Sequence, residues 1–234
     1  MRLIAAVAVA AALAGASPAP EIRTPNTLTA EEVAAGWVLL FDGASSEHFR
    51  GYRRPGFPEQ GWAVIDGTLR RTPGAAGGDI VTREQYADFE FVCEWRVSPG
   101  GNSGIIYRCT EDKGNSWETG PEMQILDDAA NAGAAPVHLA GALYDLFPCA
   151  EDAVRPTGEW NEARVVARGD HVQHFLNGVK VVDVRLNSDE YNAAHAKSKW
   201  AAMPDFAKRR RGHIALQDHG DEVWFRNIRV RVLD

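Results

Sequence analysis

The chain has 234 residues, with 25 Lys and Arg against 32 Asp and Glu, and its formal net charge is −7. An acidic chain lacks the basic surface that nucleic acids require, so nucleic acid is excluded as an expected partner. Hydrophobic residues make up 45% of the sequence, which is enough to build the core of one all-β domain.

The N-terminal segment has the features of a secretory signal. Arg2 precedes a short run of Ala, Val and Leu, and small residues follow as in a cleavage site. The run is too short to span a bilayer, so we expect residues 1–16 to be removed and the mature form to have no integral membrane span. The expected location is periplasmic or secreted. Residues 17–35 are predicted to be a tether, and residues 36–234 to be the folded domain.

Alternation of apolar and polar side chains predicts strands along the rest of the chain. The clearest run is residues 89–97, where every second side chain from Phe89 is apolar. Asp66-Gly67 and Asn177-Gly178 each separate two such runs, which predicts two tight hairpins. Further strands are predicted at residues 37–41, 62–65, 68–70, 80–82, 105–108, 122–126, 161–168, 171–176, 179–184 and within 213–232.

About a dozen short strands with turns at this spacing predict an all-β sandwich of two mostly antiparallel sheets. Two stretches interrupt the strands: residues 129–157 form a long polar loop, and residues 189–211 include a short helical patch. Long loops on a sheet scaffold often carry binding groups, and Trp117 and Trp200 lie in loops where they can stack on a sugar ring. The core is expected to contain Phe89, Phe91, Trp95, Ile214, Leu216 and Ile228.

The three cysteines are Cys93, Cys109 and Cys149, and no two of them have the spacing of metal ligands. Cys93 alternates with apolar side chains and is expected to be a buried thiol. Because export permits disulfide formation, Cys109 and Cys149 are the expected pair.

The strand at residues 121–127 carries the most chemistry. Glu122 and Gln124 share one face because strand side chains alternate, and Met123 and Ile125 point into the core. A carboxylate beside an amide can bind sugar hydroxyls or pair a base with an orienting group. A solvent-facing strand surface would show the same pattern.

Other polar side chains stand at strand ends, on the long loop or in the C-terminal turn, next to glycines that allow close approach of a ligand. Arg108 could neutralise an oxyanion or form an ordinary ion pair, and a loop histidine such as His138 could equally be solvated. The predicted substrate contacts are Asn102, Arg108, Gln124, Tyr144, Asp145, His174, Gln217 and Asp218.

Nine segments in chain order resemble the 3-keto-disaccharide hydrolase family, long known as a domain of unknown function. The resemblance implies a concanavalin A-like jelly roll and a bacterial, often exported protein that acts on oxidised sugars. The segments are LFDG at 40–43, DFEFVCEWRV at 88–97, GNSGIIYR at 101–108, PEMQILDD at 121–128, GALYDL at 141–146, GEWNEARVV at 158–166, HFLNGVKVVD at 174–183, SKWAAMPDF at 198–206 and GHIALQDHG at 212–220.

A ketone at C3 of such a substrate acidifies the proton on C2. A base removes this proton, the aglycone leaves C1 by elimination, and water adds to the enone to complete net hydrolysis. The site then needs a base, an oxyanion stabiliser and an acid for the leaving oxygen.

The catalytic candidates are His219, Glu122 and His138. An imidazole has an unperturbed pKa of roughly 6.5, so we assign the base to a histidine, with His219 favoured because Asp218 can orient it. Little upward shift is expected for the pKa of Glu122. A divalent metal ion stays open as a cofactor, with the three catalytic candidates as its ligands, and no nucleotide cofactor is expected.

Two alternatives belong to other classes. In two-carboxylate glycosidases of the sandwich-glucanase type, the catalytic strand has a Glu, an Asp two residues later and a Glu five residues after the first. Glu122, Gln124 and Asp127 stand at these positions here. However, the central residue is an amide, and a regular strand sends Asp127 to the opposite face. A non-catalytic carbohydrate-binding module can share the same fold.

Overall fold

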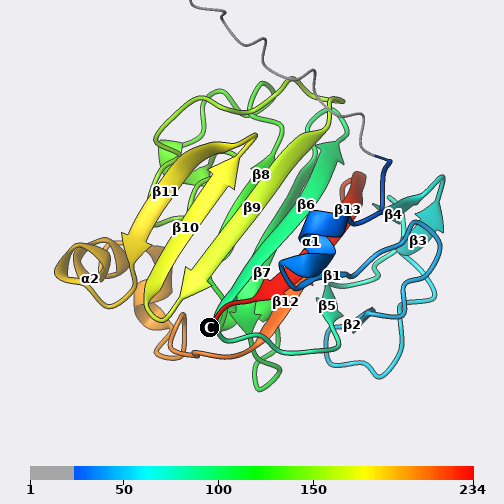
Figure 1. The fold of residues 1–234 in the computed structure, drawn as a ribbon. Helices are drawn as coiled ribbons and strands as arrows, with labels where there is room; N and C mark the ends of the chain where they lie inside the picture. Colours follow the sequence, from blue (N-terminus) through cyan, green and yellow to red (C-terminus); the bar gives the residue numbers. More distant parts are fainter. Residues whose placement is uncertain (1–23) are drawn as a thin grey trace, which may run out of the picture.

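The structure is a computed structural model that describes residues 24–234. Two antiparallel sheets face each other, with the eight-stranded sheet in front of the five-stranded sheet in Figure 1. The predicted secretory signal lies outside the described residues. Within residues 24–234, no helix is both long and apolar enough to cross a membrane.

The eight-stranded sheet has the order β11-β10-β9-β6-β13-β4-β3, and β1 also pairs with β13. Its strands are β1 (Trp37–Leu39), β3 (Trp62–Ile65), β4 (Thr68–Arg71), β6 (Phe89–Val97), β9 (Asn161–Arg168), β10 (His171–Leu176), β11 (Val179–Arg185) and β13 (Val223–Val232).

The five-stranded sheet has the order β2-β5-β12-β7-β8. Its strands are β2 (Phe49–Gly51), β5 (Ile80–Thr82), β7 (Asn102–Cys109), β8 (Glu122–Leu126) and β12 (His213–Leu216). The helical elements are α1 (Ala30–Ala34), α2 (Asp189–His195) and three 3-10 turns, η1 (Ser116–Glu118), η2 (Pro136–His138) and η3 (Lys199–Ala202).

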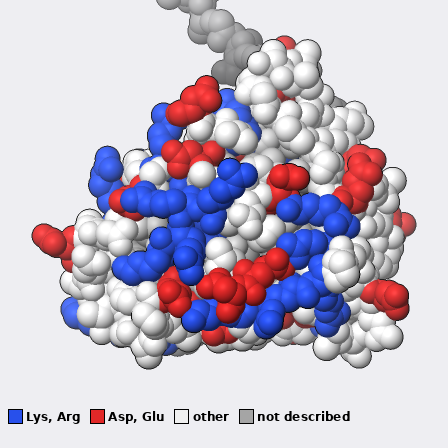
Figure 2. Space-filling view, turned by 90° about the horizontal axis from the view of Figure 1, so that it is seen from below, with Lys and Arg blue, Asp and Glu red and all other residues white. Residues whose placement is uncertain are grey.

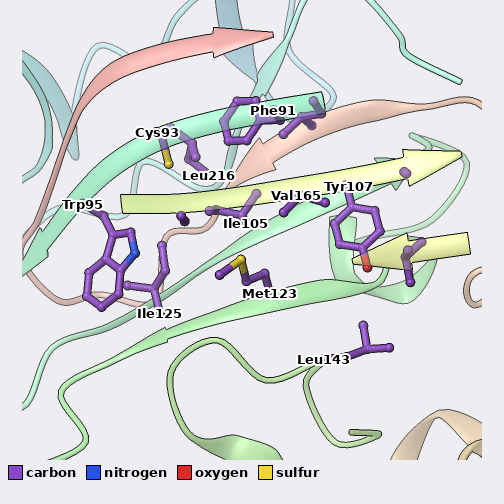
Figure 3. Close-up of a cluster of buried hydrophobic side chains, with 14 of the residues drawn as sticks. Phe91, Cys93, Trp95, Ile105, Tyr107, Met123, Ile125, Leu143, Val165 and Leu216 are labelled. Carbon is purple, nitrogen blue, oxygen red and sulfur yellow. The ribbon is translucent and has the colours of Figure 1, made fainter. Parts of the chain in front are cut away.

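The core lies between the two sheets. Figure 3 shows Phe91, Cys93 and Trp95 of β6 together with Ile105 of β7 and Met123 of β8. Burying one such large apolar side chain stabilises the fold by about 1.5–3 kcal/mol. The six predicted core residues, Phe89, Phe91, Trp95, Ile214, Leu216 and Ile228, are all buried, so the predicted alternation is confirmed.

Both predicted hairpins are present. Asp66 and Gly67 have φ values of 49° and 69°, and they join β3 to β4. Asn177 and Gly178 have φ values of 50° and 83° between β10 and β11. Positive φ at both central residues is what a type I′ turn requires.

The described part of the predicted tether is packed onto the sandwich. Helix α1 begins with a capping box between Thr29 and Glu32, and it lies across β13 and β1 in Figure 1. Asn26 is buried: its Nδ2 donates to Gly67 O (2.8 Å), and its Oδ1 accepts from Asn227 N (2.8 Å). Residues 24–35 therefore belong to the folded unit.

The expected disulfide is wrong, because all three cysteines are free. Cys109 packs with Val81, Ile106 and Ala215 in a small cluster, whereas Cys149 packs against the main core from the long loop. The two thiols belong to different parts of the fold.

The excess negative charge does not collect on the face shown in Figure 2. Lys and Arg side chains lie there between Asp and Glu side chains. On the eight-stranded sheet, Glu90 pairs with both Arg164 and Arg231, and Arg226 pairs with Glu94. Cross-strand pairs of this kind keep opposite charges adjacent.

Candidate functional site

The candidate site lies on the outer face of the five-stranded sheet, the face turned away from the other sheet. Ile105, Met123 and Leu216 point into the core, so alternation sends their neighbours outward. Strand register then places outward residues in rows across the sheet. One row contains Val81, Ala215, Ile106 and Glu122, and the next contains Gln217, Gly104 and Gln124.

The Glu122 side chain lies over Gly104 of the neighbouring strand. A Cβ atom at residue 104 would stand only 2.1 Å from Glu122 Oε1, so the carboxyl fills the space that glycine leaves. In the amide orientation that satisfies both ends of the Gln124 side chain, its nitrogen donates to Glu122 Oε1 (3.1 Å) and to Ser103 O (3.0 Å). Gln124 thus holds one carboxyl oxygen in place.

Burial raises the pKa of Glu122 to about 8. The charge of Lys199 opposes this shift, and the charge of Asp79 adds to it. The expectation of little shift is therefore wrong. It considered only Met123 and Ile125, which do point inward, but not the loops that cover the outer face.

Aromatic side chains from three loops form a wall over this face. Trp117 of η1 packs on the cluster of Val81 and Ile106, and its ring centroid is 6.1 Å from that of Trp200 in η3. Tyr144 stands 6.3 Å from Trp200. The predicted pairing of loop tryptophans with a sugar ring stays a prediction, but the structure brings the two tryptophans together.

His138 supports this wall through Asp145. His138 Nε2 lies 2.7 Å from Asp145 Oδ1, and the His138 ring stacks on Tyr144 with centroids 4.8 Å apart. Asp145 Oδ2 accepts from Lys199 N (2.7 Å). His138, Tyr144 and Asp145 are thus brought together as predicted for site residues, and they fix the start of η3.

A cleft of about 320 Å³ opens on the same face beside Trp117. Its lining includes Tyr52, Asp79, Trp117, Gln217 and His219. Asp79 accepts from Asp218 N (2.8 Å) and from the Ser116 hydroxyl, and burial raises the pKa of Asp79. The His219 side chain is 55% exposed.

Asp79 and Lys199 were missed as site residues by the sequence analysis. The signals were present, because Asp79 follows two glycines just before a strand, and Lys199 lies within the SKWAAMPDF segment.

Three predicted contacts are engaged elsewhere. Arg108 is buried and donates to Ala87 O (2.8 Å), Gly169 O (2.7 Å) and Asp88 Oδ1 (3.1 Å), so its guanidinium is used in ordinary structural bonds. His174 lies inside the core between Tyr107 Oη (3.0 Å) and Gly141 O (3.1 Å). Burial lowers the pKa of His174 to about 4.

Asp218 is the third of these residues. Its carboxylate pairs with Arg71 and accepts from Gly77 N (3.0 Å) and Gly78 N (2.8 Å). It therefore holds the glycine loop before β5 and does not orient His219, whose nearest carboxylate partner is Asp221 at 3.9 Å. Asn102 begins β7 beside the site, and its N–H donates to Asp221 Oδ2 (3.1 Å).

Within residues 24–234, no three His, Cys, Asp or Glu side chains are grouped closely enough to hold a metal ion. The proposed ligand set of Glu122, His138 and His219 is therefore not preassembled. His138 is bound to Asp145, and His219 lines the cleft with Asp79 and Gln217.

A β-sandwich with a carboxyl, an amide and aromatic rings on one sheet face defines the class of carbohydrate-active sandwich proteins. A family model described as the 3-keto-alpha-glucoside-1,2-lyase-like domain matches residues 36–231, and the chain belongs to this family. A protein of Bacteroides thetaiotaomicron named 3-keto-disaccharide hydrolase is 32% identical over 232 residues, covering 86% of this chain and 80% of that protein.

Two solved structures from Parabacteroides distasonis, both described as candidate glycosyl hydrolases, share the fold. One has a TM-score of 0.83 at 31% identity and covers 90% of this chain and 100% of its own. The other has a TM-score of 0.68 at 28% identity and covers 84% and 99%. The predicted family and the jelly-roll sandwich are both confirmed.

Proposed function

We propose that this protein cleaves 3-keto-glycosides, including 3-keto-disaccharides, by eliminating the aglycone and adding water to the product. The observation that carries the proposal is Glu122, a buried carboxyl whose pKa is about 8, on strand β8 of a face walled by aromatic rings. The family description and the name of the Bacteroides relative support the same substrate class.

Glu122 takes the role of the base in this proposal. A base works best when its pKa lies near the working pH, and burial brings the pKa of Glu122 to that range. Its Oε1 is fixed by the Gln124 amide, which leaves Oε2 to take the C2 proton. His219 is exposed and is not oriented by Asp218, so we no longer assign it the role of the base. It lines the cleft on the side where the leaving group would lie.

The leaving oxygen needs a proton, and the cleft offers two groups to supply it. Asp79 has a raised pKa and lines the cleft with His219. A carboxyl whose pKa is raised by burial keeps its proton to a higher pH than an exposed one, which favours the role of general acid.

The two-carboxylate glycosidase is disfavoured by the position of Asp127. Its Oδ2 accepts from Gly100 N (2.8 Å), and its Oδ1 bonds to the Thr157 hydroxyl. Asp127 thus secures a loop at the far end of β8 and does not face Glu122 across a shared substrate, as paired glycosidase carboxylates must.

The test compares a glucoside with its 3-keto form, using purified protein with and without a chelator. We expect turnover of the keto form alone, and a slower rate when C2 carries deuterium and proton abstraction limits the reaction. Equal turnover of both sugars would establish the two-carboxylate glycosidase. Sugar binding without turnover would establish the carbohydrate-binding module.

A further inference from the structure

The Lys199 side chain is held at the aromatic wall by its own backbone. Asp145 Oδ2 accepts from Lys199 N (2.7 Å), and Ser198 caps η3 by accepting from Trp200 N (3.2 Å). The Lys199 ammonium nitrogen lies 4.3 Å from the Tyr144 ring centroid and 4.4 Å from that of Trp200. Two cation–π contacts therefore direct the amine over the face that holds Glu122.

Within residues 24–234 this amine has no carboxylate partner, which it shares with Lys197 and Lys208, whereas the two remaining lysines have one. Lys113 pairs with Asp205 at 2.8 Å and Lys180 with Asp183 at 2.5 Å. Partial desolvation lowers the pKa of Lys199, and the charges of Glu122 and Asp145 oppose that shift. The amine is thus held beside the aromatic rings without a tight ion pair, and in its neutral form a lysine amine can attack a carbonyl carbon.

Removal of the C2 proton leaves an electron pair that needs an acceptor at C3. We infer that Lys199 supplies it covalently, by forming an iminium with the C3 ketone of the substrate, an inference that rests on the proposed function. An iminium is a stronger electron acceptor than a ketone, and lysine amines form such Schiff bases with carbonyl substrates.

The steps balance without an added oxidant or reductant. The neutral amine of Lys199 adds to C3, and the carbinolamine loses one water to give the iminium. Glu122 takes the C2 proton, and the C–H electrons form the C2–C3 double bond of an enamine. The nitrogen lone pair then re-forms the iminium as the C1–O bond breaks, giving a C1–C2 double bond, and the leaving oxygen takes a proton.

Two waters complete the cycle. One adds across the C1–C2 double bond, placing hydroxyl on C1 and hydrogen on C2. The other hydrolyses the iminium, which restores the C3 ketone and the free Lys199 amine. The water lost at the start is regained, so the net reaction consumes one water per glycosidic bond.

The experiment traps the iminium by mild reduction. The full chain is incubated with a 3-keto-glucoside and cyanoborohydride, and intact-protein and peptide mass spectra are recorded. A trapped adduct is heavier than the protein by the mass of the keto sugar less one oxygen atom. Lys199→Arg keeps the positive charge but cannot form the adduct, and Lys197→Arg, at an exposed neighbour, is the matched control.

We expect the adduct on Lys199 in the wild type and in Lys197→Arg, none in Lys199→Arg, and a loss of about 10²–10⁴-fold in cleavage by Lys199→Arg. Cleavage by the wild type without an adduct overturns the iminium and leaves the proposed function standing. Near-normal cleavage by Lys199→Arg likewise overturns the iminium and leaves the proposed function standing. An adduct on Lys199 without any cleavage supports the iminium but overturns the proposed function, and the absence of both overturns both.

Discussion

Gly104 determines how closely the Glu122 carboxyl can approach the sheet. A methyl group at residue 104 would overlap Glu122 Oε1, which lies 2.1 Å from the position of that carbon. The position of the Glu122 carboxyl on β8 thus depends on a glycine in the neighbouring strand β7. The sequence of β8 alone does not reveal this dependence.

Gly104→Ala is therefore expected to displace the Glu122 carboxyl from its bond with Gln124. Misplacing a reacting group by about 1 Å can cost roughly 10²-fold in rate, and we expect a loss of that order in kcat/KM on the keto substrate. Gly133→Ala, at a position with no neighbouring atom within 4 Å, is the control and should keep its activity. Wild-type kinetics in Gly104→Ala would show that the Glu122 position is unimportant.

The pH dependence of the reaction should report the ionisation of Glu122. Only the carboxylate can accept the C2 proton, so kcat/KM should rise with pH and level off above about 8, the pKa of Glu122. Rates measured from pH 5 to 10 check this expectation. A profile that levels off near the ordinary pKa of a carboxyl would remove Glu122 from the role.

The same group makes folding stability depend on pH in the opposite direction. Its pKa rises from an ordinary 4.5 to about 8 on folding, so the folded chain binds more protons between these values. Stability from Glu122 is then present at low pH and lost as the pH rises through this window, by up to about 5 kcal/mol. Thermal unfolding of Glu122→Gln should lack this loss. A wild-type midpoint that falls no faster than that of Glu122→Gln between pH 5 and 9 would contradict it.

At the scale of elements, the segment before β1 acts as a clamp on β13. The Asn26 side chain bonds to the backbone of Gly67 and Asn227, and Glu32 of α1 pairs with Arg229 (3.0 Å). These bonds join the β3–β4 turn to the strand that lies at the middle of the larger sheet.

Asn26→Ala should lower the free energy of unfolding by about 1–3 kcal/mol, because it leaves the buried N–H of Asn227 and the partly buried carbonyl of Gly67 without this partner. Chemical denaturation measures the change. Asn192→Ala, at an exposed position in α2, serves as the comparison and should change stability little. Equal midpoints for the two variants would mean that the clamp contributes nothing.

Regular strands and tight turns were predictable because their signals are local. The alternation in β6 and the Asp66-Gly67 turn follow from neighbouring residues alone. Arg108 was not predictable in this way, because it has a φ of 54° and lies where the register between β7 and β12 shifts. Such a bulge breaks the alternation and re-aims the side chain.

The roles within the site were harder to predict than its strands. Asp218 and His219 are adjacent in the sequence, yet Asp218 pairs with Arg71 of β4, a partner that only the three-dimensional fold supplies. The buried state of Glu122 likewise comes from loops distant in the sequence. Glu122 and Gln124 could be placed on one face because strand periodicity is sufficient for that inference.

Across the whole molecule, the outer faces of the two sheets differ. The outer face of the larger sheet carries ion pairs, whereas that of the smaller sheet carries the candidate site. The polar link of Tyr107 and His174 joins β7 to β10 through the interior. A substitution at Tyr107 or His174 that shifts β7 would therefore also shift Gly104, which lies on the outer side of the same strand.

The reactivity of the three cysteine thiols can test whether the fold contains a disulfide. All three should react with a thiol reagent in denaturant without prior reduction, since none forms a disulfide. In the folded protein, half-buried Cys149 should react first, because Cys93 and Cys109 are fully buried and burial raises the pKa of both. If only one thiol reacts in denaturant, the protein contains a disulfide, and the predicted Cys109–Cys149 pair would again be the expected one.

The position of β13 has a consequence for how the protein is made. β13 pairs with β1, β4 and β6, all of which the ribosome synthesises earlier. Until β13 emerges, β4 with β3 and β6 with β9 are two separate pieces that lack the strand between them. Pairing of segments so distant in the chain is slow, because the entropy of loop closure opposes it before the contacts form. The late position of β13 in the sequence therefore makes completion of the larger sheet wait for the C-terminal residues.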